Sequence, residues 1–484
     1  MKETTIFYLT PLTAGCTKIY SLFTHVHNSL FFGMFLRRRR IAILLLGDIL
    51  LLYVSLLVTT SSSGFFAYHN KIFFSEHVIP FSFLIALWVV VFFIAGLYDK
   101  ETLFFRKKLP SVLFNTQIIN SVLGIAFFYL VPFFRITPKT NLFIYLVISF
   151  LTILIWRLYG TKIFSNGKKQ KTLFIGSGVD FEELVREIAN NNHYNIDVVQ
   201  AVDIQKYKAE QIVPLEGLTD EIPTRGILLV VIDMGNPYIE TVVPKLYNLL
   251  FSHVRFLDMH KVYEEIFQRV PLSLIHYKWF LEHVSVSSYV THDFFKRFMD
   301  IAIGFFLGIL SLIVYPFVFL AIKLDDGGKI FTLQRRVGKN NQIIRILKFR
   351  TMNFDDGGKW ETGAVNNVTK VGQFLRKTRI DELPQLWNVL QGSISLIGPR
   401  PEFPEPVNHY NKKIPYYNIR YLVKPGLSGW AQILHEKHPH HGTDIEETAA
   451  KLSYDLYYIK NRSIMLDIEI ALKTVRILLS RRGI

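Results

Sequence analysis

The chain has 484 residues, of which 50% are hydrophobic, 14% aromatic and 19% charged. A soluble domain carries about 25% charged residues, so this composition excludes a disordered, collagen-like or simple soluble chain and predicts a membrane protein. The net charge of +16 suits anionic lipid headgroups, a phosphorylated substrate or nucleic acid, and the single cysteine, Cys16, excludes an internal disulfide.

The first third of the chain is predicted to lie in a membrane. After a segment at residues 1–40 that ends in four arginines, four apolar runs each approach the roughly 20 residues that cross a bilayer as a helix. The runs cover residues 41–60, about 79–98, about 112–134 and 142–156, and they predict a four-helix transmembrane domain at residues 41–160.

Charged residues around these runs predict their orientation. Basic segments at the four arginines, at residues 106–108 and at residues 157–171 alternate with loops that hold fewer cations. Because lysine and arginine concentrate on the cytoplasmic side, we expect the N-terminus, the middle loop and everything after the fourth helix to be cytoplasmic. Asp48 is the one acid within the first run, where it either pairs inside the bundle or has a functional role.

The middle of the chain, residues 170–285, is predicted to be a Rossmann-like α/β domain with a small parallel sheet. Strands are expected at residues 171–176, 197–202, 226–233 and 254–257, with a helix at residues 181–190. Gly176-Ser177-Gly178 lies where a dinucleotide fingerprint would begin, but Phe181 takes the place of its third small residue. We therefore expect a structural or regulatory module, with cofactor binding as the alternative.

A second kind of membrane segment is predicted at residues 301–322, an uncharged run that contains Pro316. Lys296 and Arg297 precede the run and further cations follow it, so the charge asymmetry of a crossing is missing. Since Pro316 interrupts helical hydrogen bonding, we expect a broken helix, at about residues 298–322, that enters the inner leaflet and returns. A full crossing is the alternative.

The last third concentrates cations around a carboxylate pair. The residues are Lys348 and Arg350 after a strand-like run at residues 343–347, then Arg376, Lys377, Arg379, Asp381 and Glu382. Several cations can neutralise a diphosphate, while an adjacent carboxylate either holds a divalent metal or attacks phosphorus. The alternative is a solvated helix start, where acidic residues complement the helix dipole.

Two proline-glycine turns follow, Gly398-Pro399-Arg400-Pro401 and the segment KPGLSGWAQ at residues 424–432. These blocks, in this order, resemble the polyprenyl-phosphate sugar-1-phosphate transferases, the monotopic phosphoglycosyl transferases that start bacterial surface-glycan assembly. The resemblance runs from about residue 294 to the C-terminus and implies an α/β catalytic domain at residues 291–484. The helix bundle and Rossmann-like domain ahead of it are similar to the large form of this family.

The resemblance implies a two-step transfer of sugar-1-phosphate from a UDP-sugar to undecaprenyl phosphate, with release of UMP. Asp381 would attack the sugar-bearing phosphate and carry the phosphosugar, Glu382 would assist, and Mg²⁺ would lie by Asp381. Substrate-binding groups would be Lys348, Arg350, Arg376, Arg379 and the Pro399, Arg400 and Pro401 turn, with Arg400 toward the nucleotide. The protein would lie in the bacterial inner membrane, with the catalytic domain on the cytoplasmic face and no nucleic-acid partner.

Several points stay open at this level. The family usually breaks its re-entrant helix at Ser-Pro, whereas this chain has Tyr315-Pro316, so the bend should survive but its angle is undetermined. The sugar and the oligomeric state, for which a homodimer is one option, are also undetermined. Histidines 435, 438, 440 and 441 favour an exposed loop over a metal site.

Rival interpretations of the whole chain are a membrane sensor or transporter with a nucleotide-binding domain, and a UDP-sugar-modifying enzyme that uses the middle domain.

Overall fold

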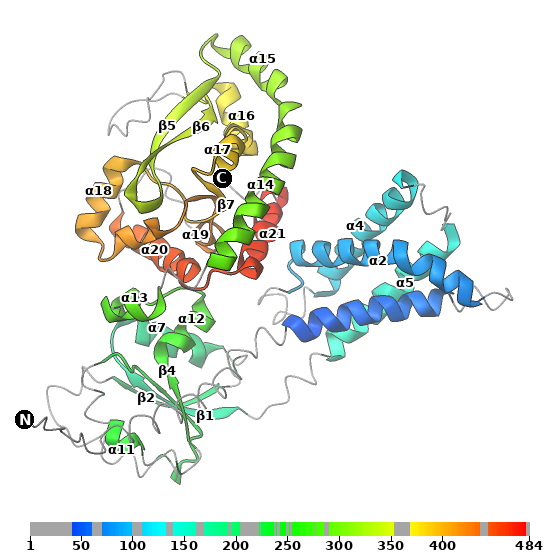
Figure 1. Cartoon of the computed structure of the whole chain (residues 1–484). Helices are drawn as coiled ribbons and strands as arrows, with labels where there is room; N and C mark the ends of the chain where they lie inside the picture. Colours follow the sequence, from blue (N-terminus) through cyan, green and yellow to red (C-terminus); the bar gives the residue numbers. More distant parts are fainter. Residues whose placement is uncertain are drawn as a thin grey trace, which may run out of the picture. The chain divides into compact units, whose positions relative to one another are not determined.

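The computed structural model describes residues 41–60, 70–98, 109–131, 139–160, 169–191, 194, 196–203, 222, 224–236, 239, 243–247, 251, 254–275, 277–284, 290–352, 368–435 and 444–480. The chain forms two compact units, Met1–Lys169 and Gln170–Ile484. Figure 1 shows helices in the first unit and mixed helices and strands in the second. The boundary coincides with a polar stretch at residues 166–171.

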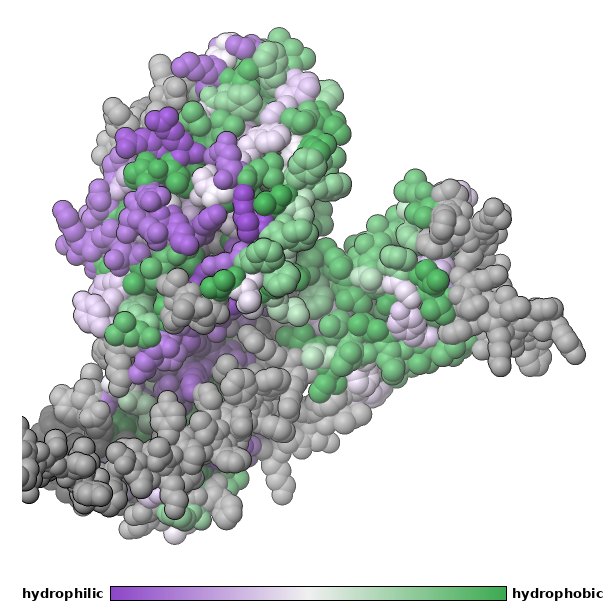
Figure 2. All heavy atoms as spheres, in the orientation of Figure 1, coloured by the Kyte–Doolittle hydropathy of each residue, from purple (hydrophilic) through white to green (hydrophobic). Residues whose placement is uncertain are grey.

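Among its described residues, the first unit contains four helices that are long and apolar enough to cross a membrane. They are Ile41–Thr60, α2 at Asn70–Ile94, α4 at Leu109–Leu130 and α5 at Lys139–Ile155, which continues as a π-helical turn at Trp156–Gly160. The rings of Trp88 and Tyr145 stack at 5.3 Å inside the bundle, and Phe81 meets Tyr145 edge-on at 4.9 Å. Phe83 and Phe143 are mostly exposed, and the surface of this unit is apolar (Figure 2). The four predicted apolar helices are confirmed.

Asp48 pairs inside the bundle, the first of its two predicted roles. Its carboxylate and the Arg157 guanidinium are both fully buried and form an ion pair, in which Arg157 Nε donates to Asp48 Oδ1 at 3.2 Å. The Tyr98 hydroxyl donates to Asp48 Oδ2 at 2.7 Å, and Arg157 Nη1 donates to the Leu97 carbonyl at 2.9 Å. Since a lone charge in a bilayer is costly, each partner needs the other. The prediction that counted Arg157 among loop cations is wrong.

The second unit begins with the predicted parallel sheet. Its strands are β1 at Gln170–Gly176, β2 at Ile196–Asp203, β3 at Leu229–Ile232 and β4 at Arg255–Asp258, in the order β2-β1-β3-β4 and all parallel. Around them lie α7 at Val179–Asn190, α11 at Val243–Tyr247, α12 at Met259–Phe267, η5 at Leu272–Leu274 and α13 at Tyr277–His283. Leu173 faces one buried cluster and Phe174 another, so both faces of the sheet are covered, as a parallel sheet requires.

Phe181 belongs to the core of this sheet domain. It is 3% exposed and shares a cluster with Phe174 and Tyr263. A Cβ atom placed on Gly176 would lie 2.6 Å from the Phe181 ring, so the ring packs directly on the end of β1. This packing favours the structural interpretation of the domain over the dinucleotide-binding one.

The rest of the second unit is an α/β region with two small sheets. β5 at Phe331–Val337 pairs antiparallel with β6 at Ile343–Phe349, and β7 at Ser395–Ile397 runs parallel to β8 at Gly426–Ser428. The helices are α14 at Val290–Leu312, α15 at Tyr315–Asp325, α16 at Lys370–Thr378, η8 at Ile380–Glu382, α17 at Gln385–Gln391, α18 at Pro404–Lys413, η9 at Tyr417–Leu422, α19 at Trp430–Leu434, α20 at Ile445–Lys460 and α21 at Ile464–Ser480.

Helices α14 and α15 form a broken pair with a bend of 53°. Pro316 lies in the first turn of α15, so the break falls where the sequence predicts it, although α14 begins earlier than residue 298. Phe298, Phe305 and Phe317 are more than half exposed. Figure 2 shows apolar side chains along α14 and α15 and polar ones on the opposite side of the region, over α18.

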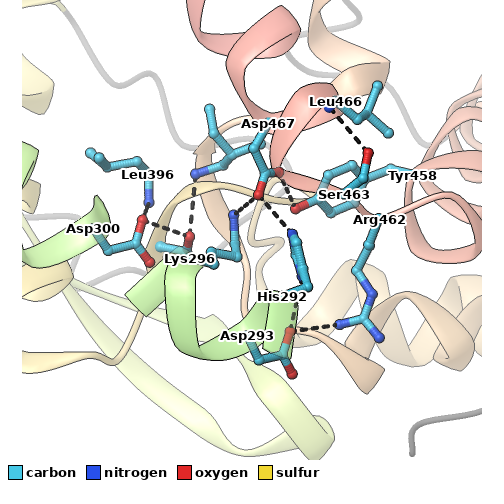
Figure 3. A network of polar contacts seen from close by, with 12 residues as sticks. His292, Asp293, Lys296, Asp300, Leu396, Tyr458, Arg462, Ser463, Leu466 and Asp467 are labelled. Carbon is cyan, nitrogen blue, oxygen red and sulfur yellow. Dashed lines mark hydrogen bonds and ion pairs between the residues drawn. The ribbon is translucent and has the colours of Figure 1, made fainter. Parts of the chain in front are cut away.

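The first turns of α14 are anchored to α21 and β7 by polar contacts (Figure 3). Asp467 Oδ2 lies 3.0 Å from His292 Nε2 and accepts a hydrogen bond of 3.1 Å from Lys296 Nζ. One turn further, Asp300 Oδ1 accepts from the Leu396 amide at 3.0 Å. The base of the broken helix pair is therefore bound to the folded α/β region.

The sheet domain and the α/β region share one core. Val270 N donates to the Ser453 carbonyl at 3.1 Å, which joins the segment after α12 to α20. The buried residues that belong to one cluster across this junction include Val270, Trp279 and Phe280 from the first side and Trp430 and Leu456 from the second. Residues 170–285 and 291–484, predicted as two domains, pack against each other within one compact unit.

Candidate active site

Asp381 and Glu382 lie together on the short turn η8. Thr369 caps the start of helix α16, where its Oγ1 accepts from Gly372 N at 2.9 Å, and Arg379, with a left-handed φ of 58°, caps the end. This residue turns the chain out of α16 and into η8. The reversal directs the carboxylate pair toward β6, where Lys348 lies.

Glu382 is held by three cations. Its Oε1 atom lies 3.1 Å from Lys348 Nζ, 3.2 Å from Arg400 Nη2 and 3.9 Å from Arg379 Nη1. Burial alone would raise the pKa of Glu382, but these cations hold the pKa well below the usual range of a glutamate. The cations thus favour the ionised form of Glu382 and are all gathered at its Oε1 atom.

Asp381 has the opposite environment. It is 8% exposed, and its Oδ1 atom is buried and has no hydrogen-bond partner in the described part of the chain. Burial raises the pKa of Asp381, and the Glu382 charge adds to this, although Lys348 and Arg376 oppose it. An unsatisfied carboxylate oxygen in a buried site is costly, so this atom is suited to bind a cation or attack an electrophile.

Arg376 lies on the other side of Asp381, on α16. Its Nε atom donates to Thr351 Oγ1 at 2.9 Å, which fixes the guanidinium next to the carboxylate pair. The helix approaches Thr351 closely, since a Cβ atom on Gly372 would lie 2.1 Å from the Thr351 carbonyl oxygen. The structure thus brings Lys348, Arg376 and Arg379 together around Asp381.

Arg350 lies in a different contact from the other predicted phosphate ligands. It forms an ion pair with Asp326, in the turn that follows α15. Its guanidinium also covers Gly328, where a Cβ atom would lie 2.0 Å from Arg350 Nη2. Asp325, the last residue of α15, accepts from Val371 N at 3.1 Å. Arg350 therefore ties the end of the broken helix pair to β6.

The two proline-glycine turns are hydrogen-bonded to each other, and the first of them presents the Arg400 side chain. Gly398 N donates to the Ser428 carbonyl at 2.8 Å, and Gly426 N donates to the Pro399 carbonyl at 2.9 Å. A Cβ atom on Gly426 would lie 2.1 Å from Gly398 N, so only glycine allows this close approach. Pro399 therefore acts through its backbone, and the Arg400 side chain reaches Glu382.

Two arginines, the buried Arg420 and the half-buried Arg336, support this turn, and sequence patterns do not single them out. Arg420 is 5% exposed; its Nη2 atom donates to the Arg400 carbonyl at 3.1 Å and lies 2.8 Å from Asp455 Oδ2. Arg336 Nη1 donates to the Pro401 carbonyl at 3.4 Å. Asp455, on the buried face of α20, was the sequence signal for Arg420, because a buried acid requires a partner.

The carboxylate pair fits a magnesium ion only through Asp381. Mg²⁺ usually takes one or two carboxylates and completes its shell with water and substrate phosphates. Among the described residues Asp381 Oδ1 has no hydrogen-bond partner and could serve as such a ligand, whereas Glu382 Oε1 already contacts cations. Within the described ranges, no group of three or more histidine, cysteine or acidic side chains could hold a metal. Residues 438, 440 and 441 of the histidine-rich stretch lie outside those ranges.

Comparison with known proteins identifies the same part of the chain. Residues 291–481 match the family described as Bacterial sugar transferase. A UDP-N-acetylgalactosamine-undecaprenyl-phosphate N-acetylgalactosaminephosphotransferase of Aeromonas hydrophila is 37% identical, with 48% of this chain and 54% of the relative covered. A UDP-glucose:undecaprenyl-phosphate glucose-1-phosphate transferase of Escherichia coli (strain K12) is 39% identical, with 37% and 39% covered.

The chain therefore spans about half or less of the length of these two relatives. A third relative, a UDP-glucose:undecaprenyl-phosphate glucose-1-phosphate transferase of Caulobacter vibrioides, is 37% identical over 195 residues, which cover 40% of this chain and 72% of the relative. From these matches and from the position of the carboxylate pair within the matched region, the chain belongs to the bacterial sugar transferase family.

Proposed function

We propose that this protein transfers a sugar-1-phosphate from a UDP-sugar to undecaprenyl phosphate through a phosphosugar carried on Asp381. The observation that carries the proposal is the asymmetry of the carboxylate pair. Glu382 is neutralised by cations, while Asp381 keeps a buried oxygen that has no partner among the residues that the structure describes. The names of the relatives support undecaprenyl phosphate as acceptor and a UDP-sugar as donor.

In the first step, an Asp381 carboxylate oxygen attacks the sugar-bearing phosphorus of the donor. A bond forms between that oxygen and phosphorus, and the bond to the bridging oxygen breaks, so that UMP leaves with the electron pair. Lys348, Arg376 and Arg379 stabilise the negative charge on the transferring phosphate. Arg400, which lies 3.2 Å from Glu382, would contact the departing nucleotide.

In the second step, a phosphate oxygen of undecaprenyl phosphate attacks the same phosphorus. The bond to Asp381 breaks, which restores the carboxylate and yields undecaprenyl diphosphate sugar. No water or redox partner is needed, and the two substrates need not occupy the site together. A magnesium ion held by Asp381 and the substrate phosphates would supply additional neutralisation of phosphate charge.

The contacts at both ends of the helix pair support a re-entrant arrangement. Near the start of α14, Lys296 donates to Asp467, and at the end of α15, Asp325 accepts from Val371 N. Both ends thus join the same α/β region, whereas a crossing would separate them by the roughly 30 Å of a bilayer core. The catalytic region would then face the cytoplasm of a bacterial inner membrane, where soluble UDP-sugars are found.

The test is UMP release by the full chain in nanodiscs, with a panel of UDP-hexoses and UDP-N-acetylhexosamines. We expect continuous UMP release only with undecaprenyl phosphate, matched mole for mole by lipid-linked sugar. Donor labelled in the sugar phosphate should leave label on the wild type without acceptor and none on Asp381→Asn. If no UDP-sugar in the panel gave UMP release, the proposed transfer would be overturned. Transfer without label retained on the wild-type protein would overturn only the covalent step on Asp381.

A further inference from the structure

The break between α14 and α15 is connected directly to the helix that follows the carboxylate pair. Trp387 Nε1, on α17, donates a hydrogen bond of 3.2 Å to the Tyr315 hydroxyl oxygen. The Tyr315 ring meets Phe349 edge-on, with centroids 5.0 Å apart, and Phe349 stacks on Phe331. The phenol therefore reaches across from the break to α17, instead of bonding within its own helix.

Helix α17 is also bound to the base of α14. Arg297 donates from Nη1 to the Val389 carbonyl and from Nη2 to the Leu390 carbonyl, both at 2.7 Å. These are carbonyls of the last turn of α17, which a cation stabilises. Between the two ends, a Cβ atom on Gly304 would lie 3.4 Å from Val389, so the helices pack closely. α17 thus contacts α14 along its length and the break at Tyr315.

The same helix determines where the catalytic groups lie. It starts at Gln385, directly after Asp381, Glu382 and a Leu-Pro step. Asn388, in its middle, accepts from Leu347 N at 2.9 Å and donates to the Arg345 carbonyl at 2.9 Å. These two hydrogen bonds from the Asn388 side chain to the backbone of β6 join α17 to the strand that carries Lys348. A displacement of α17 relative to the membrane helices would therefore move the whole ion-pair cluster.

We propose that Tyr315 is a positioning residue that sets the location of the membrane helix pair relative to Asp381, through Trp387. The inference rests on the proposed transfer reaction. A UDP-sugar reaches Asp381 from water, whereas the acceptor phosphate is confined to the bilayer surface. Loss of the Tyr315 contact should consequently impair the acceptor half-reaction and leave the donor half-reaction unchanged.

Tyr315→Phe tests this directly, because it removes only the hydroxyl. We expect kcat/KM for undecaprenyl phosphate to fall about fivefold, the size of one net hydrogen bond, while kcat/KM for the UDP-sugar stays within about twofold. Trp387→Phe removes the donor of the same bond and should show the same split. The double variant should be no worse than either single variant.

Tyr263→Phe is the matched control. It removes a buried phenol hydroxyl that donates to Glu183 at 2.7 Å, away from the active site, so both kcat/KM values should remain as in the wild type. Equal losses for donor and acceptor in Tyr315→Phe, or no loss at all, would overturn the positioning role. A wild-type protein without transfer activity would overturn the proposed function, and this inference with it.

Discussion

Lys348 Nζ donates to Glu382 Oε1 at 3.1 Å, so strand β6 holds one carboxylate of the pair. Within the described part of the chain, one oxygen of the neighbouring Asp381 stays unpaired. Two adjacent acids thus have contrasting electrostatic environments. Burial dominates at Asp381, and cations dominate at Glu382. This division separates the carboxylate that can react from the carboxylate that organises the cations.

Substitution of the two acids should change stability in opposite directions. Asp381→Asn removes a buried charge that lacks a full set of partners, so we expect Tm to be unchanged or higher while activity falls on the order of a thousandfold. Glu382→Gln leaves Lys348 and Arg400 uncompensated, and should lower the free energy of unfolding by about 3 kcal/mol. Thermal unfolding in nanodiscs provides the comparison, and a fall in Tm for both variants would contradict the assignment.

The pH dependence of activity should report Asp381. Because burial raises the pKa of Asp381, kcat/KM for the donor should decline with falling pH at a higher pH than an exposed aspartate would require. Lys348 lowers the pKa values of Asp381 and Glu382, so Lys348→Met should move the decline upward by about one pH unit. Lys348→Arg is the control that retains the charge. An unshifted profile in Lys348→Met would show that neither acid controls the rate.

Arg420 and Asp455 should behave as a coupled buried pair. Arg420→Met leaves a buried carboxylate unpaired and should lower the free energy of unfolding by about 3 kcal/mol, and Asp455→Leu in the same chain should recover most of it. Burial raises the pKa of Asp455 to about 6, and loss of Arg420 raises it further. Since a carboxyl with a raised folded-state pKa costs stability as pH rises above its unfolded pKa, the Arg420→Met defect should be larger at about pH 8 than at about pH 5.

The topology of the helix pair can be tested with single cysteines. In a Cys16→Ser background, cysteines at Thr291, at the start of α14, and at Asn340, between β5 and β6, lie at exposed positions on either side of the pair. Both should resist an impermeant thiol reagent applied to intact spheroplasts and react after lysis. Labelling of Asn340→Cys alone from outside would establish a full crossing.

Local patterns predicted most elements correctly. The apolar runs became helices, the β-rich runs became β1 to β4, and Pro316 marks a break of 53°. Each of these depends on periodicity or backbone chemistry within about 20 residues. The grouping of Lys348 with Glu382 came from a resemblance to a family, because no local pattern relates a strand to a turn 34 residues later.

Contacts between distant residues were not predictable in this way. Arg157 pairs with Asp48 across 109 residues, although its neighbours resemble a basic loop. Arg350 lies two residues after Lys348, a spacing that places both side chains on one face of a continuous strand. It binds Asp326 instead, because β6 ends at Phe349 and the chain leaves the strand there. Side-chain direction at the end of an element depends on the packing partner, which composition does not reveal.

The core shared by Val270, Trp279 and Phe280 with α20 also bears on how the chain is made. These three apolar residues leave the ribosome before Trp430 and Leu456, buried residues of the same cluster, have been translated. At typical elongation rates, the delay for some 170 residues is on the order of ten to thirty seconds. During that interval the nascent sheet domain displays an uncovered aromatic surface beside a membrane, so co-translational protection by a chaperone or by the bilayer itself becomes a requirement of biosynthesis.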